Sequence, residues 1–326
     1  MAFPLLTSLR ATLGRHTASI AAVTAAAALT LSSCEKLQEG VVNVIEFPEH
    51  EPRLAVTMFV TPGDTVLYAT VYQSAGVTDS VGSVPLKHAT VALMQGSTVL
   101  AQGDSTNWAE PDPWNSWNSG PLMKMNLDQP LELQPGAIAL VVDASPTFEP
   151  LVVTEDVPDE PVFDYVFEPY ADSVDEGWGY VYYQHRVTLD LENRPGVRDD
   201  YMISVEVKEA FEDAQWYNMA NPAYPDPRME YNSGCGCLLA TDSGEDNVSL
   251  ANLVLESYAG SPDFPIEGEM RIRVRRPTAS LANHFRSVDA YYGAFDNPFA
   301  EPTSIQGNIP EGFGIFGVTT EVVVPL

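Results

Sequence analysis

The spacing of turn residues limits the fold of this chain more than any other feature of its sequence. Short runs rich in Val, Ile, Thr and aromatic residues alternate with turns that contain Gly, Pro, Asn or Asp. Such a series of short runs is typical of β-sandwich proteins. The sequence therefore predicts a mainly β fold. The strand candidates are 54–60, 66–72, 89–94, 97–100, 137–142, 179–191, 201–207, 250–255, 269–275 and 317–324.

These strand candidates fall into two groups. Residues 151–162 lie between the groups and contain four acidic residues and two prolines. That composition is typical of a connection between domains. We therefore expect two sandwich-like domains, an N-terminal immunoglobulin-like β-sandwich over 53–150 and a second β domain over 163–326, joined by a linker at 151–162.

One segment near the C-terminus has the period of a helix. Thr278 and Ser280 are candidate N-caps at its start. Apolar residues then recur at spacings of three and four, as they do on the buried face of a helix. We expect one helix packed against the sheet. Its apolar stripe consists of Leu281, Phe285, Val288 and Tyr292.

Residues 1–33 have the parts of a lipoprotein signal peptide. The leader has two arginines and no acidic residue, the apolar run 17–31 follows, and two serines precede Cys34. The run is shorter than the roughly 20 residues that a membrane-spanning helix needs. We expect cleavage before Cys34, acylation of that cysteine with chains such as palmitate, and a tether over 34–52. Several acyl chains on one cysteine anchor a protein stably.

The charge of the mature chain excludes one class of partner. Two of the 16 basic residues and none of the 45 acidic residues lie in the leader. The mature chain therefore has 14 basic residues against 45 acidic ones, a net charge of −31. Because nucleic acid requires a basic surface, we expect no nucleic-acid binding.

The two remaining cysteines stand close together, at Cys235 and Cys237. An oxidising exported compartment permits a small disulfide loop, which would be strained and easily reduced. The alternative is two thiols on a Gly-rich turn. Zinc would require two further Cys or His at a matching spacing, and none is near. We expect neither a metal nor a cofactor.

Two segments are candidates for contact with a ligand or a partner. Trp108, Trp114 and Trp117 lie among Asn, Ser and Pro without the alternation of a strand. Exposed Trp beside polar groups stacks on sugars or docks proteins, whereas the alternative is a loop folded over its own core. The strand candidate 269–275 places three arginines on one face. We expect these arginines to pair with acids on neighbouring strands, and an anion or partner site is the alternative.

No pattern in the sequence predicts catalysis. The chain has no Gly-x-Ser-x-Gly segment, no His-Glu-x-x-His segment and no phosphate-binding loop. Only four histidines, His50, His88, His185 and His284, follow the leader. Adjacent acids are expected by chance in so acidic a chain. We therefore expect no enzyme activity.

The sequence resembles the exported lipoproteins of Bacteroidota that are grouped as domain-of-unknown-function family 4249. Four segments carry the resemblance, and together they extend over nearly the whole mature chain. The resemblance implies an accessory role beside a TonB-dependent transporter and no assigned catalytic residues. The segments are the tether that ends in Glu46–Val56, the hairpin Leu189–Ile203, the helix Ser280–Tyr292, and the series Asn297–Pro302, Gly307–Ile309 and Gly312–Gly317.

These observations lead to an expected function. We expect a lipoprotein anchored to either face of the outer membrane, acting as an accessory or binding component of a TonB-dependent transporter. A structural subunit of the pilin or adhesin type is the alternative, and a hydrolase is the third. The partners expected are a barrel transporter and the membrane itself, through the lipid on Cys34.

Overall fold

The computed structural model describes most of the chain that follows the leader and the tether. The described residues are 49–76, 79, 82–109, 120–175, 181–192, 194, 196–210, 214–242, 250–260, 268–295 and 303–326. Cys34, Trp114 and Trp117 lie outside these residues. The chain separates into two compact units, Met1–His50 and Glu51–Leu326. Within the described ranges, no helix has the length and the apolar composition needed to cross a membrane.

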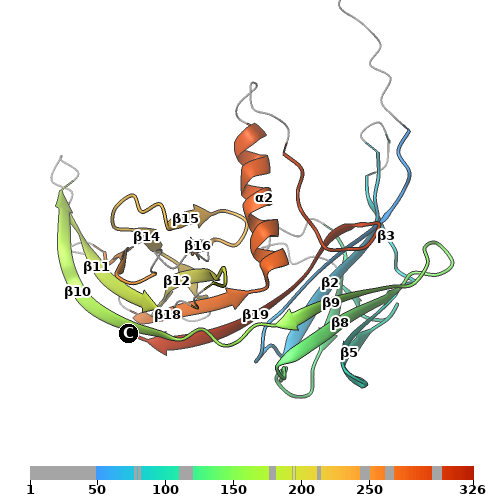
Figure 1. Cartoon of the computed structure of the whole chain (residues 1–326), viewed down its shortest axis with the longest axis horizontal. Helices are drawn as coiled ribbons and strands as arrows, with labels where there is room; N and C mark the ends of the chain where they lie inside the picture. The colour runs from blue at the N-terminus through green and yellow to red at the C-terminus, as the bar shows by residue number, and fades with distance from the viewer. Residues whose placement is uncertain are drawn as a thin grey trace, which may run out of the picture. The chain divides into compact units, whose positions relative to one another are not determined.

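The unit Glu51–Leu326 is mainly β with one packed helix near the C-terminus, as predicted (Figure 1). Among the described residues, its largest sheet has 11 strands. In spatial order these are β15 (Met229–Asn232), β16 (Cys237–Thr241), β12 (Asp200–Glu209), β18 (Gly268–Pro277), β19 (Phe313–Pro325), β1 (Leu54–Val60), β2 (Val66–Gln73), β7 (Leu122–Asn126) and β6 (Trp108–Ala109), with β13 (Tyr217–Asn218) beside β12 and β3 (Val84–Pro85) beside β2.

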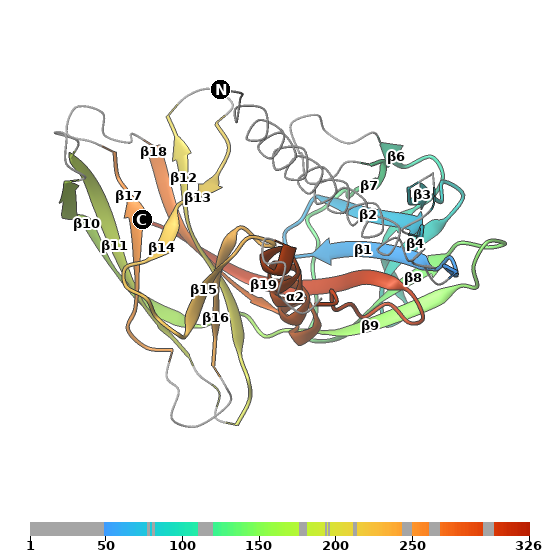
Figure 2. The ribbon, with the colours of Figure 1, turned by 90° about the horizontal axis from the view of Figure 1, so that it is seen from above.

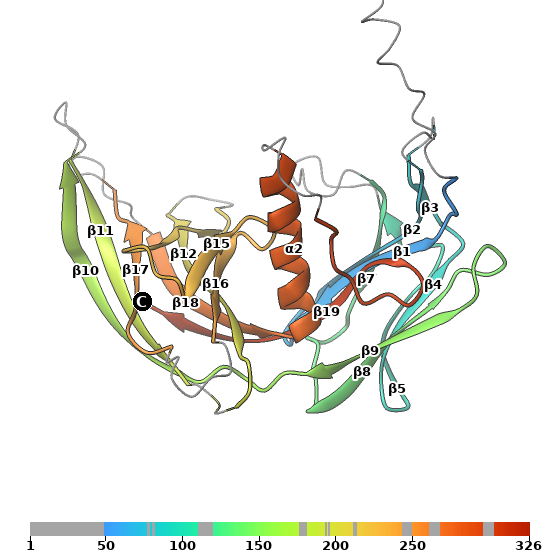
Figure 3. The ribbon, with the colours of Figure 1, turned by 45° about the horizontal axis from the view of Figure 1, so that its top comes forward.

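Two smaller sheets pack against this one, and each has four strands in the described part of the chain. One sheet has the order β10 (Phe163–Asp175), β11 (Val181–Leu191), β17 (Leu253–Tyr258) and β14 (Ala220–Pro222). The other has the order β5 (Thr98–Gly103), β4 (Thr90–Gln95), β8 (Gly136–Asp143) and β9 (Leu151–Val157). Strand β10 lies at the outer edge of its sheet (Figure 3).

Two main hydrophobic cores lie between these sheets. The first core joins alternate residues of β1 and β2 to those of β4, β7 and β8. The second core joins β11, β12, β17 and β18. Strand β1 alternates strictly between buried and less buried positions, which is the pattern of a strand with one face in a core.

Strand β19 connects the two regions that the sequence predicts as separate domains. It pairs in parallel with β1 and antiparallel with β18, so strands close to the two ends of the unit lie side by side (Figure 2). Its residues Phe316 and Val318 belong to the first core. The boundary between 53–150 and 163–326 stays a prediction.

The expected linker contains a strand. Seven of the residues in 151–162, Leu151–Val157, form β9 and pair with β8. The two flanking prolines, Pro150 and Pro158, bound the strand without interrupting it, and only 158–162 lacks regular structure. Proline is tolerated at the ends of strands, so proline content alone does not identify a linker here.

The helix α2 (Ala279–Phe295) covers one face of the largest sheet (Figure 1). Leu281 and Phe285 are buried in a third, small hydrophobic cluster with Ile315 of β19. Gly317 of β19 permits this close packing, because a Cβ there would lie 2.7 Å from a methyl carbon of Leu281. The predicted stripe is wrong at its last member, since Tyr292 is 57% exposed.

Candidate binding groove

The arginine row on β18 pairs with acids, as expected. Arg271 and Arg273 flank Glu206 of β12, with nitrogen–oxygen distances of 2.6 and 2.9 Å. Arg273 and Arg275 also approach Glu321 of β19, at 2.8 and 3.5 Å. Burial, the largest effect, lowers the pKa of Arg275 below its ordinary value. The row is thus paired with acids on both neighbouring strands.

Only one tryptophan of the aromatic segment lies among the described residues. Trp108 is in β6, is half-buried, and packs against the first core. Its indole Nε1 is buried and has no hydrogen-bond partner within the described part of the chain. This position agrees with a residue folded over the core at Trp108. The contact role predicted for Trp108, Trp114 and Trp117 stays a prediction.

Cys235 and Cys237 form a disulfide, with 5.2 Å between their Cα atoms. Of the two alternatives left open by the sequence, the structure has the disulfide loop. Asn232 and Ser233 fasten this turn to α2, because the Asn232 side chain donates to the carbonyl of Phe285 at 3.0 Å and the Ser233 hydroxyl donates to Asp289 at 2.7 Å. The disulfide therefore holds a turn that supports the helix.

The described histidines have separate surroundings. The Nε2 atom of His88 lies 3.1 Å from the carbonyl oxygen of Ala144, and Nδ1 of His284 lies near the carbonyl of Gln306. His185 is buried beside Phe167, with ring centroids 5.4 Å apart, and burial lowers its pKa. In the described ranges no group of three His, Cys, Asp or Glu is arranged to hold a metal ion.

A pocket of about 380 Å³ lies at the start of α2, and three arginines and four aspartates line it. Asp199 is buried and accepts hydrogen bonds from Arg194, which raise the pKa of Arg194. Arg276 also donates to the hydroxyl of Tyr201. Arg286 pairs with Asp200 from the helix side. Arg276 of β18 also lies 3.9 Å from Asp199. Together these contacts tie the turn before β12 to the end of β18, and β12 to α2, which is a structural role.

A larger groove of about 600 Å³ lies where the chain enters β1. Three segments that are distant in sequence form it: residues 51–54, residues 148–152 and residues 310–311. Leu54, Phe148 and Leu151 give it an apolar floor, and Leu54 is buried. Such concave sites, with an apolar lining and a few polar groups, are the usual form of a ligand site. This groove is the best candidate functional site among the described residues.

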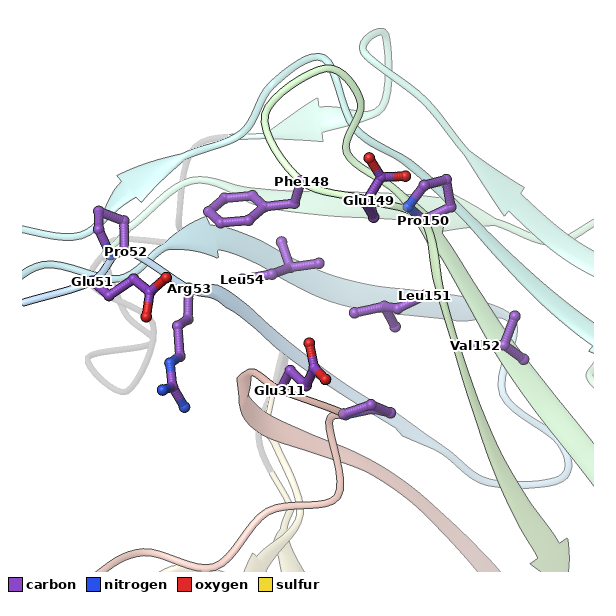
Figure 4. A pocket seen from close by; sticks show the side chains of 11 residues that line it. Glu51, Pro52, Arg53, Leu54, Phe148, Glu149, Pro150, Leu151, Val152 and Glu311 are labelled. Atoms are coloured by element: carbon purple, nitrogen blue, oxygen red, sulfur yellow. The ribbon is translucent and has the colours of Figure 1, made fainter.

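Three glutamates surround the apolar floor of the groove (Figure 4). Glu149 lies on one side of Phe148 and Leu54, Glu311 lies on the other side, and Glu51 lies at one end. All three carboxylates are exposed. Arg53 also lines the groove, but its guanidinium carbon lies 5.9 Å from the ring centroid of Phe313. The rim is therefore predominantly negative.

Close backbone packing builds the lower wall of the groove. A Cβ on Gly312 would lie 2.4 Å from the carbonyl oxygen of Leu54, and a Cβ on Gly314 would lie 2.0 Å from that of Val56. Only glycine permits this approach to β1. Glu311, which directly precedes Gly312, has a φ of 53°, a conformation that non-glycine residues seldom adopt and that often occurs at functional sites.

A side-chain clamp also fixes this wall. The Asn308 side chain accepts from the backbone N–H of Phe316 and donates to its carbonyl, both at 2.8 Å. The groove was not predicted, because no sequence pattern relates 148–152 to the other two segments. The only signal was that 51–54 and 310–311 border or lie within segments that carry the family resemblance.

The comparisons with known proteins add no functional information. No protein-family model and no curated protein matches this chain. Among solved structures, a crystal structure of bovine butyrophilin matches 68% of this chain and 91% of its own length, at 6% sequence identity and a TM-score of 0.18. A likeness that weak carries no argument. The resemblance to family 4249 stays a prediction.

Proposed function

We propose that this protein is a lipoprotein anchored to the outer membrane that acts as a binding component of a TonB-dependent transporter. The lipobox at Cys34 supports the anchor, and the groove supports the binding role. The third alternative, a hydrolase, receives no support from a described cluster of catalytic groups. A binding role requires only a shaped surface and a fixed location.

The observation that carries this proposal is the location of the groove beside the tether. Glu51 lines the groove, and it follows the proposed lipid attachment site, Cys34, by 17 residues. Even a fully extended tether of that length spans at most about 60 Å. With Cys34 acylated, the groove would stay within that distance of the membrane, where a transporter barrel would be its neighbour.

A mild-detergent pull-down tests the proposal. Tagged wild-type protein and the tagged variant Cys34→Ala are purified from separate cultures. The proteins that copurify with each are identified by mass spectrometry. We expect wild type to recover a TonB-dependent barrel and the variant to lose both the barrel and labelling by a fatty-acid probe. Equal labelling of the two proteins would contradict the anchor. A wild type that recovers no barrel would contradict the accessory role.

One observation favours the structural alternative as a second candidate. Strand β10 is a 13-residue edge strand, and its exposed residues include Val166 and Tyr170. Such an edge can receive a strand from another subunit. However, β10 contains Pro169, several acids and a register shift after Glu168, which are features that oppose strand addition. A ladder of self-oligomers in the same pull-down would favour this alternative.

A further inference from the structure

The groove has a free strand edge along one side. Strand β9 is the last strand of its sheet and, among the described strands, pairs with β8 alone. Its first two residues, Leu151 and Val152, line the groove, and Val152 is 56% exposed. The backbone N–H and C=O groups on the open side of an edge strand are available to an extended segment.

The C-terminal half of β9 is already covered by other parts of this chain, which limits where an added segment can lie. Glu155 accepts hydrogen bonds from Ser280 and Asn308, so the chain before β19 and the start of α2 lie over this half. Only the end of β9 at Leu151 and Val152 opens into the groove. A segment bound there would lie over Phe148 and Leu54, between Glu149 and Glu311 (Figure 4).

The lining of the groove defines the composition of that segment. In an extended chain, successive side chains point to opposite faces, so alternate residues would contact the apolar floor. The remaining side chains would face the rim of Glu51, Glu149 and Glu311, which favours Lys or Arg. A second copy of this chain is a poor source of such a basic segment, because its mature part has 14 basic residues against 45 acidic ones.

We propose that the groove binds an extended peptide segment of a partner protein, with alternating apolar and basic residues, which pairs with the free edge of β9. This inference rests on the proposed binding role and names the chemistry of the partner. Main-chain hydrogen bonds would supply affinity, and the floor and the rim would supply specificity.

Binding of a defined peptide tests the proposal. The probe is a ten-residue peptide of alternating Lys and Val, titrated by calorimetry into the full-length protein in nonionic detergent micelles. The groove variant is Glu51→Gln/Glu149→Gln/Glu311→Gln, whose three positions are exposed and leave the core unchanged. We expect the variant to bind the peptide about tenfold more weakly, which corresponds to about 1.4 kcal/mol.

Two controls separate the groove from general charge attraction. The matched variant Glu160→Gln/Asp164→Asn/Glu168→Gln removes three exposed carboxylates in and before β10 and should change the affinity less than about twofold. A peptide with N-methylated valines cannot complete strand pairing and should bind wild type about tenfold more weakly. Absent binding to wild type, equal loss in both variants, or unchanged binding of the methylated peptide would each overturn the proposal.

The two proposals fail in different ways. If the peptide does not bind while wild type still recovers a barrel from cells, the accessory role stands and the peptide groove is wrong. If the peptide binds in the groove while no barrel is recovered, the groove is right and its partner is a different protein.

Discussion

Two phenylalanines of β19 have opposite surroundings, although they are three residues apart. Phe316 is fully buried in the first core, whereas Phe313 is 47% exposed beside Arg53. Removing a buried ring loses its transfer free energy and leaves a cavity. We therefore expect Phe316→Ala to lower the free energy of unfolding by about 3–5 kcal/mol.

Phe313→Ala is the matched control for this substitution. Its exposed contact with Arg53 is worth at most about 1 kcal/mol. Urea unfolding followed by tryptophan fluorescence compares the two variants with wild type. If Phe316→Ala were no more destabilising than Phe313→Ala, the start of β19 would not be anchored in the core.

His185 should make stability depend on pH. The ring is buried, and its Nδ1 accepts the backbone N–H of Tyr170 at 3.2 Å, so the neutral form is required there. Burial lowers the pKa of His185 in the folded protein below its ordinary value of about 6.5. In the window below about pH 6.5 the unfolded chain therefore binds more protons than the folded chain, and stability falls as the pH falls.

The measurement is the midpoint of urea unfolding at pH 7.5 and pH 5.5. We expect the difference between these two values to be smaller in His185→Gln than in wild type. The control is His88→Gln, which makes the same substitution at an exposed histidine. Identical pH dependence in His185→Gln and wild type would show that protonation of this histidine is not linked to folding.

At the scale of single residues, sequence patterns predict burial where periodicity is strong. The alternation in β1 and the spacing of Leu281 and Phe285 identify core positions correctly. The prediction is wrong for Tyr292, which is exposed. Helical spacing indicates which face of a helix is apolar, but it does not indicate how far along the helix that face is buried. Phe148 and Glu149 of the groove carry no local signal, since the site depends on contacts between segments far apart in sequence.

At the scale of elements, the turn that contains Cys235 and Cys237 should stabilise α2. The turn contacts the helix through Phe285 and Asp289. A disulfide that closes so short a loop contributes about 1–2 kcal/mol in the chain-entropy model. We expect a thiol reductant to lower the melting temperature by a few degrees and to accelerate amide hydrogen exchange in α2.

The double variant Cys235→Ser/Cys237→Ser is the control for reduction. Its melting temperature should match that of the reduced wild type and should not respond to the reductant. If the reductant affected this variant equally, the change would come from another source. If it left the wild type unchanged, the turn would be held by Asn232 and Ser233 without help from the disulfide.

The sequence predicts ten of the strands in the described part of the chain and misses the others, most of which have five residues or fewer. The two longest strands that it misses, β9 and β10, are missed for different reasons. Strand β9 was assigned to a linker because Pro150 and Pro158 flank it, although Leu151 and Val153 already alternate toward the core. Strand β10 was missed because its inner residues are only partly buried, so its alternation is weak. Edge strands generally show less of the buried pattern from which strands are predicted.

At the scale of the whole molecule, β19 decides whether the protein unfolds in one step or two. Phe316 and Val318 belong to the first core, and Leu326 packs against the second. The same strand pairs with β1 on one side and with β18 on the other. If either core unfolded, β19 would lose strand pairing and buried contacts on that side. The other core would then lose part of its support, because β19 also contributes to it.

We expect this coupling to give a single cooperative transition. In scanning calorimetry, the calorimetric and van 't Hoff enthalpies should agree, which is the test of two-state unfolding. The substitution Phe316→Ala should then shift the whole transition, including signals that arise from the second core. Two resolved transitions, of which Phe316→Ala lowers only one, would contradict this expectation. They would instead support the division into independent domains at 53–150 and 163–326 that the sequence predicts.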